Sequence, residues 1–125
     1  MREIKFRAWD INNKRYYYDI QGTHDENIGD SFQNIIDSEN FIVEQYAGLK
    51  DRNGVDIYGG DIIDTHWGNK ENRLVKYNIG LGFYLTPEQY QSYWTIAHRG
   101  KYEVIGNIHE DRDLLNAKMN KRDIL

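Results

Sequence analysis

The dipeptide Asn53-Gly54 predicts a sharp reversal of the chain near its middle. Asn and Gly both accept the positive φ angles that a tight hairpin turn requires. The pair lies between Leu49 and residues 55–57, so β-strands are expected on both sides of the turn. The chain is therefore constrained to antiparallel strand pairing at this point.

The apolar residues favour strands over helices along the whole chain. Ile and Val together number 19, against 7 Leu and 4 Ala, and there are 10 tyrosines. Branched and aromatic side chains suit a pleated, half-buried sheet surface. We therefore predict a mainly β domain (a β-rich α+β fold) with a barrel-like core, of which an SH3-like barrel is one form, and two or three short helices.

Alternation of apolar and polar residues places the strands. Ile4, Phe6 and Ala8 alternate with Lys5 and Arg7, the period of two that is typical of a sheet with one buried face. A polar loop at residues 68–72 should join two strands that pair with each other, residues 61–63 and 73–79. The other predicted strands are residues 15–20, 40–46, 81–85 and 102–108.

A capping pattern predicts the first helix. Asp30 precedes Gln33 by three residues, which is the spacing of a helix cap and its partner. Phe32, Ile35 and Ile36 then fall on one face, which predicts a short helix of about two turns before the strand at residues 40–46.

Two more helical segments are expected near the C-terminus. Residues 86–89 carry Thr, Pro and Gln at the positions that open a helix, and this helix should end near residues 93–94. Asp111 is expected to cap a terminal turn that bears Leu114 and Leu115.

The length of 125 residues fits one domain. We predict a single β-rich domain over residues 1–115 and a tail over residues 116–125 that is frayed or docked on a neighbouring subunit.

The formal net charge is −4, so the chain as a whole repels phosphate backbones. There are no cysteines, which excludes disulfides and thiolate chemistry. The sequence contains no signal-peptide or membrane-span pattern, so a cytoplasmic location is expected.

Few residues are candidates for catalysis. Asp61, Asp64 and His66 are the best set for a metal-dependent hydrolase, but only Asp64 and His66 share a strand face, and a catalytic zinc site needs three protein ligands. Asp61 directly follows two glycines, where its carboxylate would accept backbone N–H groups and hold a turn. The sequence has no nucleotide-binding glycine motif. We therefore predict no catalytic residues, no metal and no cofactor.

The candidate interaction surface combines cationic and aromatic side chains. Residues 14–18 interleave the two kinds, and base stacking on tyrosine would suit single-stranded nucleic acid. Protein contact is the favoured interpretation, because Tyr and Trp are enriched where proteins meet, and ten tyrosines with three tryptophans exceed what one small core hides. The predicted surface residues are Lys5, Arg7, Lys14, Arg15, Tyr16, Tyr17, Tyr18, Trp67 and Trp94.

Three blocks of the sequence resemble one family. Residues 2–10 read REIKFRAWD, residues 45–62 read QYAGLKDRNGVDIYGGDI, and residues 103–110 read EVIGNIHE. These blocks are similar to the opening, the TGLKDKNG and IYEGDI runs, and the VIGNIYEN closure of the YopX family. Small departures are Ala47 in place of Thr, Gly59 in place of Glu, and Asp111-Arg112 in place of Asn-Pro.

The resemblance implies a small protein encoded by a phage or prophage, with a β-rich, barrel-like fold that assembles into oligomers. The family has no established activity and brings no catalytic residues. We predict a non-enzymatic, self-associating binding or structural module in the cytoplasm of a bacterial host, with further copies and an unidentified host or phage protein as partners. The alternatives are a nucleic-acid-binding module that uses Lys5, Arg7, Lys14, Arg15 and residues 16–18, and a metal-dependent hydrolase.

Overall fold

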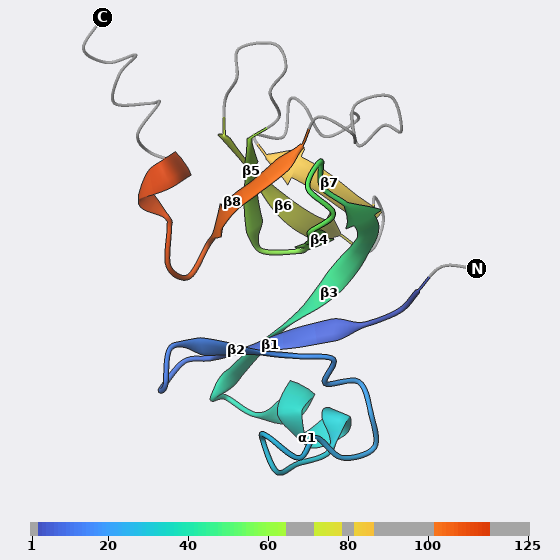
Figure 1. Ribbon diagram of the computed structural model, residues 1–125. Coiled ribbons are helices and arrows are strands. Elements are labelled where there is room, and N and C mark those ends of the chain that lie inside the picture. Colours follow the sequence, from blue (N-terminus) through green and yellow to red (C-terminus); the bar gives the residue numbers. More distant parts are fainter. Residues whose placement is uncertain (1–2, 65–71, 79–81, 87–101, 116–125) are drawn as a thin grey trace, which may run out of the picture. The chain divides into compact units, whose positions relative to one another are not determined.

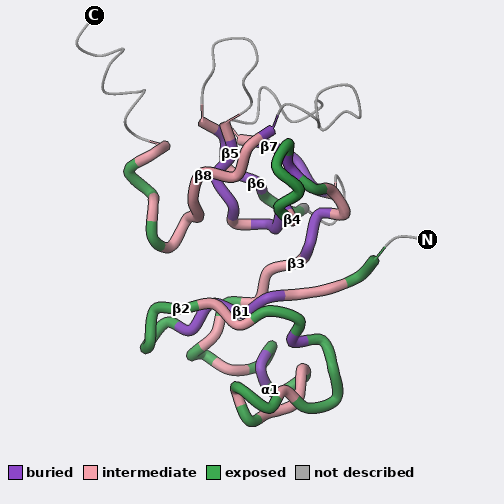
Figure 2. Tube along the Cα trace, in the orientation of Figure 1, coloured by how far each residue is buried: buried purple, intermediate pink, exposed green. Residues whose placement is uncertain are grey.

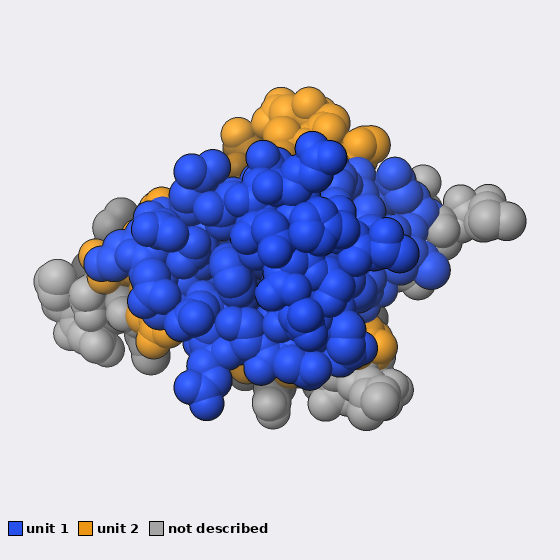
Figure 3. All heavy atoms as spheres, turned by 90° about the horizontal axis from the view of Figure 1, so that it is seen from below, with its two compact units in different colours: residues 1–48 blue, residues 49–125 orange. Residues whose placement is uncertain are grey.

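A computed structural model describes residues 3–64, 72–78, 82–86 and 102–115 (Figure 1). The chain divides into two compact units, unit 1 over Met1–Gly48 and unit 2 over Leu49–Leu125 (Figure 3). The protein is mainly β with a curled half-barrel sheet, which confirms the predicted fold class. The single domain over residues 1–115 stays a prediction, and the tail over residues 116–125 lies outside the described residues.

Unit 1 is an antiparallel sheet with one short helix. β1 pairs with β2 on one side and with β3 on the other, which gives the strand order β2-β1-β3. Register opposes Ala8 to Tyr17 and to Val43 across the two ladders. The elements are β1 (Phe6–Asp10), β2 (Arg15–Tyr18), α1 (Phe32–Asp37) and β3 (Phe41–Lys50).

The core of unit 1 lies on one face of this sheet, which we call the helix face. Ala8, Ile20 and Ile35 are buried there, and Ile35 is the buried residue of α1 (Figure 2). Phe6 and Ala8 face this core as predicted, but the expected wet face is wrong, because Arg7 and Trp9 are also buried and Ile4 is exposed. Partly buried side chains complete the cluster: Phe6, Tyr17, Ile28, Phe32, Phe41 and Val43.

The start of α1 differs from the prediction by one residue. Ser31, not Asp30, is the N-cap, and its side-chain oxygen accepts the backbone N–H of Asn34. Asp30 instead accepts from the Asn34 amide and from the Ser31 N–H. Of the three apolar residues of α1, Phe32 and Ile35 pack in the core, whereas Ile36 is exposed.

Unit 2 contains a second antiparallel sheet, of order β7-β6-β5-β8. The predicted pairing of residues 61–63 with residues 73–79 is confirmed, because β5 pairs with β6 and places Ile62 opposite Leu74. β5 also pairs with β8, where the register shifts by one residue next to Gly106. The elements are β4 (Asp56–Tyr58), β5 (Asp61–Asp64), β6 (Asn72–Asn78), β7 (Gly82–Thr86) and β8 (Glu103–Asn107).

The chain reversal at Asn53-Gly54 is confirmed, and a buried carboxylate organises it. Asp51 Oδ1 accepts the N–H groups of Asn53 and Val55, and Gly54 has the expected positive φ of 83°. Asp51 Oδ2 accepts the N–H of Val104 in β8. The turn is thus tied to the last strand of the sheet by the same side chain.

Two helical segments were predicted for the last third of the chain. The helix expected after residue 86 lies outside the described residues. The predicted terminal turn is present, with helical residues 113–115, but the side chain of Asp111 does not cap it, since its Oδ2 accepts the backbone N–H of Asn107.

Candidate interaction surface

The second face of the unit 1 sheet is rich in aromatic and charged side chains. In the ladder registers, Arg7 is opposite Tyr18 and Glu44, and Trp9 is opposite Tyr16 and Ile42. Directly opposite residues of antiparallel strands project from the same face, so these side chains lie together, away from the helix face. We call the set Arg7, Trp9, Tyr16, Tyr18, Ile42 and Glu44 the tyrosine face.

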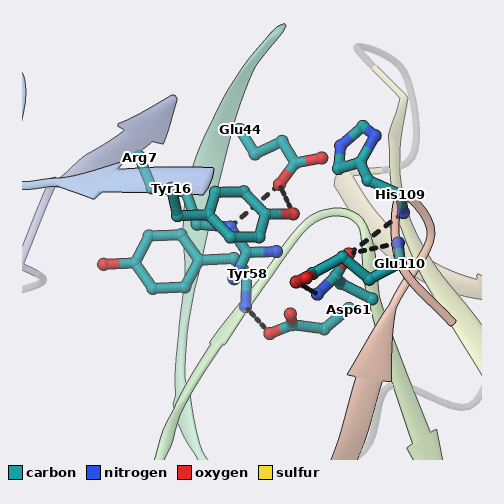
Figure 4. Close-up of polar contacts among 8 residues, drawn as sticks. Arg7, Tyr16, Glu44, Tyr58, Asp61, His109 and Glu110 are labelled. Atoms are coloured by element: carbon teal, nitrogen blue, oxygen red, sulfur yellow. Dashed lines mark hydrogen bonds and ion pairs between the residues drawn. The ribbon is translucent and has the colours of Figure 1, made fainter. Parts of the chain in front are cut away.

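A charged group and a ring are stacked at the centre of the tyrosine face (Figure 4). Arg7 Nε donates to Glu44 Oε1 over 2.8 Å, and the Tyr16 hydroxyl donates to the same oxygen over 2.8 Å. The Arg7 guanidinium lies 4.0 Å from the centroid of the Tyr16 ring, which is cation–π geometry. Arg7 therefore has a counter-ion and a stacking partner within its own sheet.

Aromatic contacts continue from Tyr16 in two directions. The rings of Trp9 and Tyr16 meet edge to face with centroids 5.0 Å apart, and the Tyr16 and Tyr18 rings are 5.8 Å apart. Trp9 is buried, whereas the relative solvent exposure is 52% for Tyr18 and 41% for Ile42. The tyrosine face thus combines a buried centre with exposed apolar residues.

A tight hairpin turn places the two exposed cations of the predicted surface. Asp10 Oδ1 accepts the N–H groups of Asn12 and Asn13, and Asp10 Oδ2 accepts from the Asn13 amide. Hydrogen bonds from the Asn13 backbone and side chain hold the pKa of Asp10 below its ordinary value. The turn ends at Lys14 with φ 55°, and β2 begins at Arg15.

β2 is the end strand of its sheet among the described strands. The guanidinium of Arg15 lies 4.7 Å from the centroid of the Tyr17 ring, and Tyr17 in turn meets the Phe41 ring at 6.3 Å. Asp19 follows the strand with φ 57° and is exposed. The end strand is therefore flanked by a cation at its start and a carboxylate just past its end.

The structure brings most of the predicted surface residues onto or beside this sheet but exposes only some of them. Lys14, Arg15 and Tyr18 are exposed, while Tyr16 and Tyr17 are half-buried. Lys5 is half-buried, forms an ion pair with Glu3 at 3.4 Å and lies 4.7 Å from the Tyr46 ring centroid. Arg7 is buried, which argues against a contact between this guanidinium and a phosphate. Trp67 and Trp94 lie outside the described residues.

The residues proposed for hydrolysis have a different arrangement. Asp61 Oδ2 accepts the backbone N–H of Tyr58 over 2.8 Å, so Asp61 holds the turn between β4 and β5 as predicted (Figure 4). Asp64 lies opposite Asn72 in the ladder, and His66 lies outside the described residues. In the described part of the chain, no three His, Cys, Asp or Glu side chains are grouped as metal ligands would be.

Two carboxylates were missed from the sequence. Asp51 was only part of a motif, although an Asp two residues before Asn-Gly is the usual acceptor for the N–H groups of such a turn. Asp19 is the second, and it follows Arg15 by four residues, just past the end of β2. A search for opposite charges at the two ends of a predicted strand would have found it.

The fold and the tyrosine face together describe a small, mainly β protein with an aromatic, charged sheet surface. The family model described as YopX protein matches residues 5–116, so the chain belongs to the YopX family. The fold is similar to the crystal structure of protein EF1440 from Enterococcus faecalis, with a TM-score of 0.64 and 28% identity over 92% of this chain and 99% of that chain. No curated protein matches the chain.

Proposed function

We propose that the protein is a non-enzymatic binding module that associates with copies of itself through the unit 1 sheet. The supporting observation is the exposure of Tyr18 on the end strand β2, beside the Tyr16 ring. Ile42 adds a second exposed apolar side chain on the same face. Exposed aromatic side chains next to an end strand are typical of surfaces that bind protein.

The carboxylates of the sheets favour a structural role over catalysis. Asp51 accepts three backbone N–H groups and Asp61 accepts one, so both are engaged in turns. A general acid or base needs a free site for a substrate proton within hydrogen-bond reach. The hydrolase alternative therefore has little support.

The setting of this function is part of the proposal and rests on the resemblance to the family. We infer that the protein is encoded by a phage or prophage and acts in the bacterial cytoplasm, where a host or phage protein is a further partner. No helix among the described residues is long and apolar enough to cross a membrane. Trp67 and Trp94 remain candidates for contacts with such a partner.

Nucleic-acid binding is the second candidate, and one observation favours it. Lys14 and Arg15 are adjacent and exposed next to Tyr17 and Tyr18, as a single-strand binding surface would require. The buried Arg7–Glu44 pair and the net charge of −4 oppose it.

Co-purification tests the two candidates together. Copies that carry two different affinity tags are co-expressed, and self-association predicts that both tags elute together after either purification. Gel shifts with single- and double-stranded DNA and RNA at low salt are run on the same protein. Separate elution of the tags with a clear, salt-sensitive gel shift would replace self-association by nucleic-acid binding.

A further inference from the structure

We propose that β2 pairs antiparallel with β2 of a second copy, so that Arg15 of each chain faces Asp19 of the other. This inference rests on the proposed self-association and names its surface and register. Among the described strands the sheet ends at β2, and a strand at the end of a sheet is a template for adding another strand.

The two faces of the sheet limit the possible registers. Tyr16 and Tyr18 project from the tyrosine face, and Arg15 and Tyr17 project from the helix face. A two-fold axis normal to the sheet keeps each face on its own side. Residues that oppose one another must then come from the same face, as in any antiparallel ladder. This leaves registers centred on Tyr16, Tyr17 or Tyr18.

Charge selects the register centred on Tyr17. It opposes Arg15 to Asp19 at both ends of the pairing, giving two identical ion pairs. The registers centred on Tyr16 or Tyr18 do not oppose Arg15 to Asp19, and a parallel arrangement would bring Arg15 against Arg15. Opposite charges across a ladder stabilise it, and like charges destabilise it. Lys14, next to Arg15, adds to the attraction for Asp19.

The same register suits the aromatic side chains of the strand. Tyr16 of one copy faces Tyr18 of the other on the tyrosine face, and this pair also occurs twice. Cross-strand aromatic pairs add stability beyond the backbone hydrogen bonds. The left-handed residues Lys14 and Asp19 bound β2, so the new ladder is short and the ion pairs lie at its two ends.

Two charge reversals test this register, alone and mixed. Arg15→Asp and Asp19→Lys each replace two attractive contacts by two repulsive ones in a dimer of identical chains. In a one-to-one mixture, each variant complements the other at both ends. Lys is chosen at position 19 because Lys14 already has a similar backbone conformation, with φ 55°.

Sedimentation velocity measures the dissociation constant of each sample. We expect each variant alone to associate about tenfold more weakly than wild type, and the mixture to return to within about threefold of wild type. Exposed charge changes of the same sign, Arg112→Asp and Glu39→Lys, are the controls and should leave association unchanged. Circular dichroism checks that each variant is folded; if Arg15→Asp is not, Arg15→Glu takes its place.

The outcomes separate this inference from the proposed function. If wild type is monomeric at all concentrations, both are wrong. If wild type associates but the single variants associate equally well, or the mixture is not restored, the β2 register is wrong and self-association stands. Rescue in the mixture requires contact between positions 15 and 19 of different chains, so a purely structural role of either residue would not produce it.

Discussion

Arg7 and Glu44 form an ion pair inside the unit 1 sheet, with 2.8 Å between Arg7 Nε and Glu44 Oε1. The relative solvent exposure of the two side chains is only 4% and 9%. The two residues are directly opposite in the β1–β3 ladder. A buried pair of this kind stabilises little by itself, but removal of one partner leaves a buried charge without its counter-ion.

We therefore expect Glu44→Gln to lower the free energy of unfolding by about 3 kcal/mol, because Arg7 would lose its counter-ion. The double variant Arg7→Met with Glu44→Leu should be more stable than Glu44→Gln. Urea denaturation measures both values. Tyr16→Phe, which removes only the hydroxyl that donates to Glu44, is the control and should cost about 1 kcal/mol. A double variant less stable than Glu44→Gln would contradict this account of the pair.

Asp51 is predicted to be the most sensitive side chain of the central turn. Asp51→Ala removes the acceptor of three backbone N–H groups and should cost about 3 kcal/mol. Asp51→Asn keeps an oxygen for Asn53 and Val55 but presents an NH₂ group to the Val104 N–H, so it should cost about half as much. Thermal and urea unfolding test the order of the three proteins. An Asn variant as stable as wild type would show that the contact to Val104 contributes nothing.

Position 106 is predicted to require glycine, because the side chain of Asp111 occupies the space that a Cβ would fill. A Cβ added to Gly106 would lie 2.7 Å from the Asp111 Cβ and 2.6 Å from its Oδ2. Gly106→Ala should therefore displace Asp111 from the Asn107 N–H and cost about 1–3 kcal/mol. Gly22→Ala is the matched control, because its added Cβ would come no closer than 4.0 Å to the His24 carbonyl oxygen. Equal melting temperatures for the two variants would refute the prediction.

Asp10 should make stability depend on pH in the acid range. Hydrogen bonds from the Asn13 backbone and side chain lower the pKa of Asp10 from 3.8 in the folded protein. The stability that the carboxylate contributes is therefore fully present above that value, and it is lost as the pH falls through the lower, folded-state pKa. Hydrogen bonds from the Asn34 side chain and the Ser31 N–H lower the pKa of Asp30 in the same direction.

The urea midpoint of wild type is expected to fall between about pH 6 and about pH 3, and that of Asp10→Asn is expected to fall less. Asn keeps an oxygen for the backbone N–H groups of Asn12 and Asn13 but does not titrate. Asp37→Asn, on the exposed side of α1, is the control for a carboxylate outside the turn. Identical pH profiles for wild type and Asp10→Asn would contradict the role given to Asp10.

Local signals predicted the parts of the fold that local physics determines. The chain turns at Asn53-Gly54 because Gly54 readily adopts its positive φ of 83°, and Asp61 accepts a backbone N–H from three residues away. The predicted N-cap of α1 was wrong by one residue, because Asp30 and Ser31 are adjacent and both are good caps.

Long-range contacts could not be predicted in the same way. The alternation in β1 correctly put Arg7 opposite the core face, where an exposed cation is the ordinary expectation. Its burial depends on Glu44, 37 residues further along the chain, and no sequence period links the two. The candidate surface stays a prediction, and its exposed cations among the described residues are Lys14 and Arg15.

The most direct test of self-association is the solution mass of the wild-type chain, measured by light scattering over a range of micromolar concentrations. We predict a mass of at least twice that of one chain at the highest concentration, falling toward one chain on dilution as subunits separate. A mass equal to one chain at every concentration would contradict the central claim.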